Sequence, residues 1–323
     1  MHLNLITFKN VSKQYEDGTI AVKEINLEIK QGEFFVLIGP SGCGKTTTLK
    51  MINRLHDVTS GNLYIADKKV TDHNINELRW EIGYVLQQIA LFPHMTIAEN
   101  IAVVPEMKGW KKNKIKKRVD ELLELVGLDP KQYRNRKPSE LSGGQQQRIG
   151  VARALAADPP VILMDEPFSA LDPLSRDQLQ QDVLALKEKI KKTFVFVTHD
   201  MSEAMTLGDR ICLMKDGEVV QIGTPEEFIQ KPKNDFVKSF IGNQGSILLQ
   251  PLEVFVNETN QQDFEHIEAP VQLKSSAPIS EAIELLQEND YVGVYKGSRK
   301  IGIVTNKNIL AFLSNKSKQG AMV

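Results

Sequence analysis

The sequence predicts an α/β protein built around a parallel sheet, and three observations support this prediction. Short apolar runs alternate with amphipathic segments up to about residue 242. Two of the runs, at 160–167 and 193–200, are continuously apolar, as in strands that are covered on both faces. The amphipathic segments place their apolar residues on one helical face. Strands that alternate with helices along a chain form an α/β core.

The expected elements follow in chain order. The first strand is FFVLIG at 34–39, and a helix, TTTLKMINRL, follows the glycine loop in which it ends. Further strands are expected at EIGYVLQ (81–87), PVILMDEP (160–167) and TFVFVTHD (193–200). Further helices are expected at IKKRVDELLELVGL (115–128) and SRDQLQQDVLALKEKI (175–190). Gly127 suits the stop of the first of these two helices.

The chain divides into two predicted domains. Residues 1–242 form the α/β domain, and residues 243–264 form a linker that begins with NQGSILLQ. Residues 265–323 form a small α+β domain with the order β-α-β-β-α, and its end, NKSKQGAMV, is expected to be disordered. This second part is small for a self-sufficient hydrophobic core.

Composition narrows the class of protein. The 323 residues carry a formal net charge of −1, so bulk charge gives no reason to expect binding to nucleic acid. The two cysteines, Cys43 and Cys212, lack zinc-site spacing and fit a reducing cytoplasmic setting. No apolar run approaches the roughly 20 residues that span a bilayer, and the N-terminus does not resemble a signal peptide. We therefore expect a soluble protein that meets a membrane through partners.

One segment has the pattern of a phosphate-binding loop. GPSGCGKT at 39–46 follows a predicted strand and opens a helix. Its glycines allow backbone N–H groups to point at phosphate oxygens, where the helix N-terminus adds positive potential. Lys45 can neutralise the β and γ phosphates, and the Thr46 hydroxyl can bind Mg²⁺. The predicted nucleotide-binding residues are Tyr15, Gly39, Pro40, Ser41, Gly42, Cys43, Gly44, Lys45, Thr46 and Thr47.

Polar residues at the ends of other strands complete the predicted catalytic site. Asp165 closes one apolar strand and is expected to meet Mg²⁺, and Glu166 follows it as the predicted general base. His199 ends another strand, at the edge where α/β proteins bind their ligands. It is predicted to sense the γ phosphate.

The motifs together resemble those of ATP-binding-cassette (ABC) ATPases. GPSGCGKT is similar to the Walker A loop, VILMDE to the Walker B strand, and LSGGQ at 141–145 to the signature motif. SALD at 169–172 is similar to the D-loop, with Asp172, and His199 to the switch histidine. The resemblance covers residues 3–242 and implies a P-loop NTPase fold, with a RecA-like core and a helical subdomain.

The resemblance also assigns roles to further residues. Gln87 is similar to the Q-loop glutamine, next to the alternative Gln88. The resemblance implies that Gln87 is a catalytic residue with Glu166 and His199 and that it binds Mg²⁺ with Thr46 and Asp165. Tyr15 lies where the family stacks an aromatic ring on adenine. Two cassettes of the family close head to tail, which implies that LSGGQ contacts ATP in the other subunit of a homodimer. The residues implied in that contact are Ser142, Gly143, Gly144 and Gln145.

Finer similarity points to one group of importers. LKMINRLHDVTSG (49–61), IGYVLQQIALFPHMTIAENI (82–101) and MDEPFSALDPLSRDQLQQDV (164–183) resemble bacterial ATPases that import glycine betaine, carnitine and choline. This similarity implies ATP and Mg²⁺ as cofactors, with permease subunits and a substrate-binding protein as partners, at the cytoplasmic face of the membrane. Residues 88–110 are the candidates for permease contact. Importers of polyamines, sugars or amino acids, and a nucleotide switch on nucleic acid or the ribosome, are the alternatives.

Two segments keep open interpretations. IGIVTNKNIL at 301–310 is similar to the end of a cystathionine-β-synthase-type (CBS) module, but only one copy is found, at about 265–315. It can sense ionic strength or nucleotide, or it can serve dimerisation alone. The basic run MKGWKKNKIKKR at 107–118 can be a solvated helix face or a contact to anionic lipid or to a membrane partner.

Overall fold

The computed structural model describes residues 4–88, 90–244, 250–259, 267, 269–286, 288–309 and 312, of which 173, 174, 229, 230, 242–244, 258, 280 and 284 are described for the backbone alone. The chain forms two compact units, Met1–Lys238 and Ser239–Val323, and each is described by itself. The tail predicted at 315–323, residues 245–249 of the predicted linker and Ile89 lie outside the described residues.

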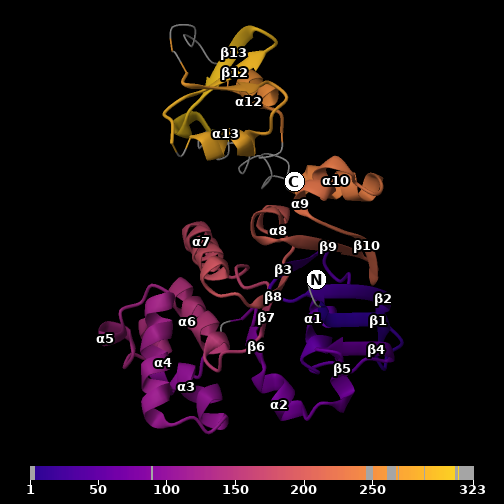
Figure 1. Ribbon diagram of the computed structural model, residues 1–323, viewed down its shortest axis with the longest axis vertical. Coiled ribbons are helices and arrows are strands. Elements are labelled where there is room, and N and C mark those ends of the chain that lie inside the picture. The colour runs from indigo at the N-terminus through magenta and orange to yellow at the C-terminus, as the bar shows by residue number, and fades with distance from the viewer. Residues whose placement is uncertain are drawn as a thin grey trace. The chain divides into compact units, whose positions relative to one another are not determined.

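A six-stranded sheet forms the centre of the first unit (Figure 1). Its order is β10-β9-β3-β8-β7-β6; β9, β3, β8, β7 and β6 pair in parallel, and β10 is antiparallel to β9. The bounds are β3 Phe34–Ile38, β6 Ile82–Val85, β7 Val161–Asp165, β8 Thr193–Val197, β9 Arg210–Lys215 and β10 Glu218–Gly223. β3, β7 and β8 are buried along their whole length, which confirms the predicted parallel core.

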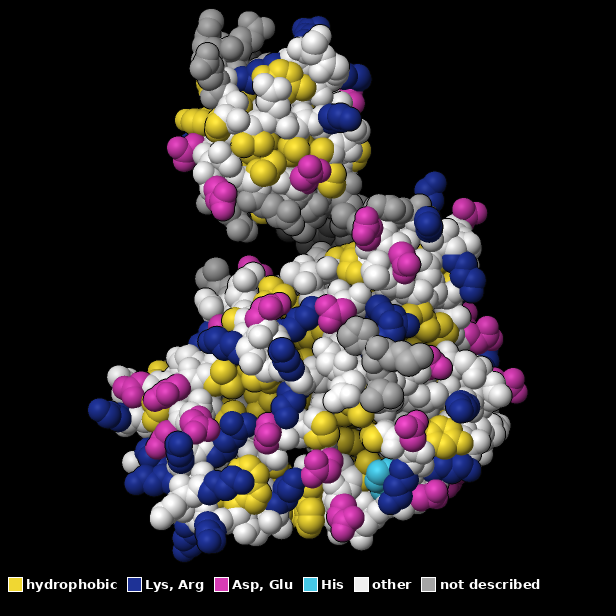
Figure 2. Space-filling model, viewed as in Figure 1, with side chains coloured by type: hydrophobic (Ala, Val, Ile, Leu, Met, Phe, Trp, Pro, Cys, Tyr) yellow, Lys and Arg dark blue, Asp and Glu magenta, His cyan; other side chains and the backbone are white. Residues whose placement is uncertain are grey.

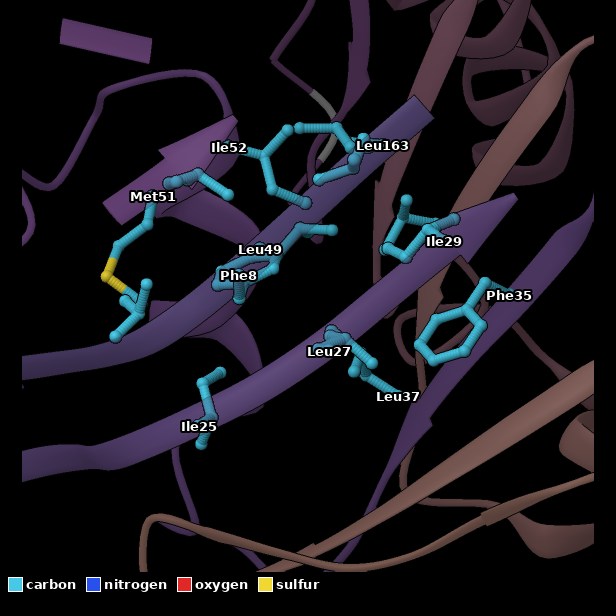
Figure 3. Close-up of a cluster of buried hydrophobic side chains, with 14 of the residues drawn as sticks. Phe8, Ile25, Leu27, Ile29, Phe35, Leu37, Leu49, Met51, Ile52 and Leu163 are labelled. Atoms are coloured by element: carbon cyan, nitrogen blue, oxygen red, sulfur yellow. The ribbon is translucent and has the colours of Figure 1, made fainter. Parts of the chain in front are cut away.

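A second, antiparallel sheet in this unit has the order β2-β1-β4-β5. Its strands are β1 Asn4–Gln14, β2 Ile20–Lys30, β4 Ser60–Ile65 and β5 Lys68–Lys69. Alternate residues of β2 are buried, which is the pattern of a sheet with one face on the core. These strands were not predicted from the sequence. The two sheets enclose a shared core with the helix α1, as Figure 3 shows for Phe8, Leu27, Phe35, Leu49 and Leu163.

Helices surround the sheets and build a separate helical group. α3 to α6 lie together beyond the β6 edge of the central sheet, where α6 packs on β6 (Figure 1). This arrangement confirms the expected P-loop core with a helical subdomain. The helices of the first unit are α1 Lys45–Ile52, α2 Ile75–Trp80, α3 Ile97–Met107, α4 Lys112–Leu125, α5 Pro130–Tyr133, α6 Gly143–Leu155, α7 Pro173–Lys189, α8 Met201–Leu207 and α9 Pro225–Gln230, with 3-10 turns η1 Val70–Asp72 and η2 Pro138–Glu140; α10 Asp235–Gln244 crosses the unit boundary.

The second unit has its own core around a three-stranded sheet. Its order is β11-β12-β13, with β11 and β12 parallel and β12 and β13 antiparallel. The bounds are α12 Leu252–Glu258, β11 Val271–Lys274, α13 Ile279–Leu285, β12 Val292–Lys296 and β13 Arg299–Val304, and 306–309 is helical. The observed order of strand, helix, strand and strand is the expected one.

The structure differs from the expected linker at residues 252–258. These residues form α12, and Leu252 and Phe255 are fully buried in the core of the second unit. Phe255 packs edge-on against Phe312, with ring centroids 5.2 Å apart. The apolar residues Leu252, Phe255 and Val256 have the i, i+3, i+4 spacing of one helical face, so this segment contributes to the core rather than only connecting the units.

Candidate nucleotide site

The loop between β3 and α1 has the backbone conformation that a phosphate cradle needs. Gly39, Gly42 and Gly44 have φ angles of 152°, 79° and 101°, which L-residues with a side chain rarely adopt. A Cβ at Gly39 would lie 2.2 Å from the carbonyl oxygen of Met214, and one at Gly44 would lie 2.3 Å from that of Ala21. Glycine is therefore required at both positions by the packing of the loop as well as by its φ angles.

Lys45 is a buried cation at the start of α1. Its side chain is 5% exposed, and its ammonium donates to the carbonyl oxygens of Gly39 at 2.8 Å and Pro40 at 2.9 Å. Among the described residues, no carboxylate lies within ion-pair distance of this ammonium. α1 begins here at the N-cap Gly44, with no side-chain cap and no acidic residue in its first turn. A buried cation and uncapped helix N–H groups fit an anionic ligand.

Cys43 contributes to this loop differently from its neighbours. Its side chain is 3% exposed and belongs to the core between the two sheets. Burial raises the pKa of the Cys43 thiol. The thiol therefore packs into the core beneath the loop, and only the backbone of Cys43 is available to contact a phosphate. Ser41, by contrast, is exposed on the loop.

Thr46 and Asp165 meet at the point predicted for the metal. The Thr46 hydroxyl donates to Oδ1 of Asp165 at 2.8 Å, and Asp165 is 4% exposed at the end of β7. Tyr84, which the sequence analysis missed, donates its hydroxyl to the other oxygen, Oδ2, at 3.2 Å. Burial and the neighbouring Asp165 raise the pKa of Tyr84 well above its usual value, so the phenol stays a donor. The Thr46 hydroxyl and the Asp165 carboxylate are ligands of the kind that Mg²⁺ prefers.

Glu166, His199 and Gln87 come together beside this pair. Nδ1 of His199 lies 3.1 Å from Oε2 of Glu166, and the Gln87 amide donates to the same oxygen at 3.5 Å. Of the two adjacent glutamines, Gln87 is thus the one that contacts Glu166. Glu166 has a φ of 43°, fixed by the hydrogen bond from its N–H to the Val197 carbonyl at 3.0 Å. A non-glycine residue in this region stores backbone strain.

A group of hydrogen-bonded residues supports the segment that carries His199. The Thr198 hydroxyl donates to Oε2 of Glu203, and the N–H of Asp200 donates to the Thr198 oxygen at 3.0 Å. Glu203 is 6% exposed, and burial raises its pKa to about 7. Both neighbours of His199 in the chain are therefore fixed by one buried acid. Glu203 was not predicted from the sequence, because an acidic residue in the first turn of a helix is common at the surface.

Tyr15, the residue predicted to stack on adenine, lies beside the phosphate loop. Its hydroxyl is 3.2 Å from the Thr47 hydroxyl on α1. The ammonium of Lys13 lies 5.4 Å from the centre of the Tyr15 ring, and His56 meets that ring edge-on at 5.7 Å. The half-buried ring is thereby held next to the phosphate loop.

The segment LSGGQ opens α6 and satisfies its own backbone. Ser142 is the N-cap: its hydroxyl accepts from the N–H of Gln145 at 3.3 Å, and the Gln145 side chain accepts from the N–H of Ser142 at 3.0 Å. This reciprocal capping box leaves the N–H groups of the glycines at an exposed helix start. Gln145 also donates to the hydroxyl of Tyr133 at 3.2 Å.

The two signature glycines have different surroundings. A Cβ at Gly143 would meet nothing within 4 Å, whereas one at Gly144 would lie 3.2 Å from the Ser175 side chain on α7. Asp172 caps α7 by accepting from the N–H of Ser175 at 3.1 Å. The D-loop is therefore linked to the signature segment through the first turn of α7, while Gly143 faces open space.

Comparisons with known proteins agree with this geometry. The family model described as ABC transporter matches residues 22–169. The glycine betaine/carnitine/choline transport ATP-binding protein OpuCA of Bacillus subtilis is 50% identical over 288 residues, which are 88% of this chain and 73% of that protein. The chain belongs to the ABC transporter ATP-binding proteins. As an ABC ATPase it binds ATP and couples its hydrolysis to transport.

Two further comparisons extend the family assignment. The osmoprotectant import ATP-binding protein OsmV of Salmonella typhimurium is 48% identical over 290 residues, or 88% of this chain and 74% of that protein. A solved dimeric, post-hydrolysis state of an ATP-binding cassette bound to ADP and Pi matches with a TM-score of 0.62 and 40% identity. It covers 68% of this chain and 99% of its own. None of the helices described in this ABC ATPase has the length and apolar character needed to cross a membrane.

Proposed function

We propose that the chain is the ATP-hydrolysing subunit of an importer for quaternary-ammonium osmoprotectants such as glycine betaine, carnitine and choline. The observation that supports this substrate class is the similarity of about 50% identity to transport proteins of that class, which in some of them extends beyond the first unit. The first unit ends at Lys238, about 74% of the 323 residues, so the 88% of the chain matched by OpuCA must include part of the second unit. Over 74% of the chain, the glycine betaine uptake system ATP-binding protein YehX of Escherichia coli is 50% identical and the spermidine/putrescine import ATP-binding protein PotA of Clostridium novyi is 46% identical.

The arrangement of the site supports a role for each polar group in phosphoryl transfer. Lys45 and the start of α1 bind the phosphates, and Tyr15 stacks on adenine. Mg²⁺, held by Thr46, Asp165 and Gln87, would neutralise the charge of the phosphate oxygens. Glu166 accepts the proton of the attacking water. His199 orients the Glu166 carboxylate through the contact at 3.1 Å.

A second copy of the chain completes the site. The capping box of Ser142 and Gln145 and the open space at Gly143 support a contact from α6 to the γ phosphate bound by the other subunit. In a symmetric dimer this arrangement makes two equivalent composite sites, with Asp172 at the same junction. Closure depends on ATP, and hydrolysis releases it.

An apolar groove supports docking to a permease at the cytoplasmic face of the membrane. The groove, of about 440 Å³, is lined by α3, β6 and α6, with Phe92, Val103 and Val104 from the segment 88–110 that was predicted for permease contact. Phe92 is 47% exposed. Leu86 also lines the groove and precedes Gln87, so a partner in the groove is next to the catalytic site. Substrate recognition then belongs to the permease and a substrate-binding protein.

The second unit serves as a single CBS-like module. Its order of strand, helix, strand and strand, with β11 and β12 parallel, supports this likeness. Its described core consists of a few helices on one three-stranded sheet. Such a small core favours pairing with a second copy of this unit, because a small domain buries little apolar surface by itself.

The decisive experiment measures ATP hydrolysis by the chain assembled with its permease in liposomes. Glycine betaine, carnitine, choline, a polyamine and a sugar are offered with the cognate binding component at low and high internal salt. Stimulation by a quaternary amine is the expected result. Stimulation by the polyamine or the sugar alone would replace the substrate class and leave the ATPase assignment unchanged. A salt response that disappears when the second unit is removed would show that this unit senses ionic strength.

A further inference from the structure

The basic run at 107–118 folds into a surface that lies mostly outside the segment 88–110 proposed for permease contact. It forms the end of α3, a turn and the start of α4. The run contains seven Lys or Arg residues and no acidic residue, in a chain whose net charge is −1. Figure 2 shows Lys and Arg side chains gathered around hydrophobic ones in the region that α3 and α4 occupy in Figure 1.

Part of this charge is paired within the chain and part of it is not. Lys108 pairs with Glu81 at 2.6 Å, and Arg118 lies 3.6 Å from Glu121 and 3.9 Å from Asp158. Four exposed lysines of this run have no carboxylate at ion-pair distance among the described residues; they are Lys111, Lys112, Lys114 and Lys116. We call these the four α4 lysines.

The positive charge lies at the end of α4 that is already positive. The N-cap is Lys111, whose side chain makes no cap hydrogen bond, and the first turn has no acidic residue. Helices usually place acidic or Ser, Thr, Asp or Asn residues there, because the first N–H groups and the helix dipole attract negative charge. The observed pattern is unfavourable for the isolated chain and becomes favourable when an external anion approaches.

Trp110 gives this surface an aromatic ring in a fixed position, within a depression that is otherwise lined mainly by charged side chains. The ammonium of Lys114 lies 3.5 Å from the centre of the Trp110 ring, and both line a depression of about 470 Å³. The backbone N–H of Trp110 donates to the backbone carbonyl of Pro105 at 3.0 Å, so the turn that carries the ring is fixed to α3. Met107, next to this turn, is 61% exposed. Basic side chains beside Trp and exposed apolar groups are typical of surfaces that lie at a membrane interface.

The location of the surface indicates which partner it meets. The depression at Trp110 and the apolar groove assigned to the permease share Ala157, and Lys108, which lines the depression, is the C-cap of α3, the helix that lines the groove. This step rests on the proposed function: if a permease occupies the groove, the neighbouring lysines face the same membrane.

We propose that the Trp110 turn and the four α4 lysines form a docking surface for anionic phospholipid head groups. The lysines attract the phosphate groups of the bilayer surface, and Trp110 and Met107 enter the head-group region. Each lysine near an anionic membrane strengthens binding several-fold, and the contribution declines with ionic strength.

The test measures co-sedimentation of the full chain with vesicles of phosphatidylcholine alone and of equal parts phosphatidylcholine and phosphatidylglycerol. The wild-type chain is expected to bind the anionic vesicles and to leave them at high salt. Replacing the four α4 lysines with Gln should lower the partition coefficient at least about tenfold. The matched control replaces four exposed lysines elsewhere with Gln and should bind as the wild type does; these are Lys68, Lys189, Lys191 and Lys231.

Trp110→Ala separates the aromatic contact from the charge. It should weaken vesicle binding about three- to tenfold and leave the salt dependence unchanged, because the lysines remain. If the four-lysine variant fails to fold, Lys114→Glu is measured in its place and should also weaken binding to anionic vesicles.

Three results would overturn the inference. The first is equal binding of the wild type to both vesicle types, and the second is an equal loss in the control variant. The third is a four-lysine variant that binds vesicles normally but no longer assembles with the permease in detergent, which would identify an acidic protein segment as the partner. Vesicle binding through α4 without stimulation by any quaternary amine would remove the proposed substrate and leave this surface standing.

Discussion

The phosphate loop and the signature segment both start a helix with glycines, but they differ in how far the chain covers them. In the loop, Lys45 is 5% exposed and donates to backbone carbonyls, and Thr46 binds Asp165. In the signature segment, Ser142 and Gln145 cap each other and Gly143 faces open space. One segment is built into the core, whereas the other is ordered by its own capping and left accessible.

This difference explains how one fold makes a site that opens and closes. The covered half has its charges positioned before ATP binds, so little reorganisation is needed there. The open half can approach a second molecule without losing internal contacts. Each of the following predictions tests one side of this comparison.

The largest effect is expected at the covered half from Lys45→Ala. Removing a buried ammonium that faces the phosphates should lower ATP affinity at least about a hundredfold. Lys50→Ala, one turn later on α1, is the matched control and should bind ATP normally. Binding of a fluorescent ATP analogue measures both. An unchanged affinity in Lys45→Ala would contradict the phosphate role of this residue.

Glu166→Gln tests the chemistry separately from binding. The amide cannot accept the proton of the attacking water, so turnover should fall at least about a hundredfold. ATP binding should remain, and the two halves should stay closed as an ATP-dependent dimer, detected by light scattering. Glu188→Gln, an exposed change on α7, serves as the control. Fast hydrolysis by Glu166→Gln would assign the general base elsewhere.

Gly143→Ala tests the open half against a matched glycine of the same helix. A Cβ at Gly143 or at Gly150 would meet nothing within 4 Å in the single chain, so both substitutions to Ala should leave folding intact. Only Gly143 is expected to face the ATP of a second subunit. Gly143→Ala should therefore reduce ATPase activity about ten- to a hundredfold, while Gly150→Ala keeps it. Equal activities would show that the signature segment does not approach a ligand.

Glu203→Gln tests the group of hydrogen-bonded residues that supports His199. Burial raises the pKa of Glu203 from 4.5 to about 7, so the folded state keeps a proton that the unfolded state loses. The contribution of this proton to stability is complete below pH 4.5 and is lost as the pH rises to about 7. This pKa shift corresponds to about 3 kcal/mol in the free energy of unfolding. Between pH 4.5 and pH 8, the wild type should lose this amount relative to the Gln variant.

Denaturant unfolding at the two pH values measures this difference. Glu188→Gln is again the control, because an exposed acid should show no such pH-dependent gain. A stability difference between Glu203→Gln and the wild type that is independent of pH would mean that Glu203 ionises normally in the folded protein.

The same comparison shows what the sequence can predict. The buried strands β3, β7 and β8 and the glycine loop were predicted because continuous apolar runs and a phosphate motif each have one main explanation. Tyr84 was missed because an aromatic residue in a strand is usually part of the core, and only the pairing of β6 with β7 brings its hydroxyl to Asp165. α12 was missed because its one-turn apolar pattern is short and polar residues flank it.

The smallest effect is expected from Tyr84→Phe, which removes one contact from the covered half. Asp165 would keep the Thr46 hydroxyl at 2.8 Å but lose the Tyr84 hydroxyl at 3.2 Å. Because a single hydrogen bond to a charged group contributes about 1.5–3 kcal/mol at most, the Mg²⁺ concentration for half-maximal ATPase activity should rise about three- to tenfold. Tyr64→Phe on β4 is the control. If Tyr84→Phe instead lowers the maximal rate at saturating Mg²⁺, Tyr84 acts on the position of Glu166 through the end of β7, and the covered half transmits structure to the reacting groups rather than only holding the metal ligand.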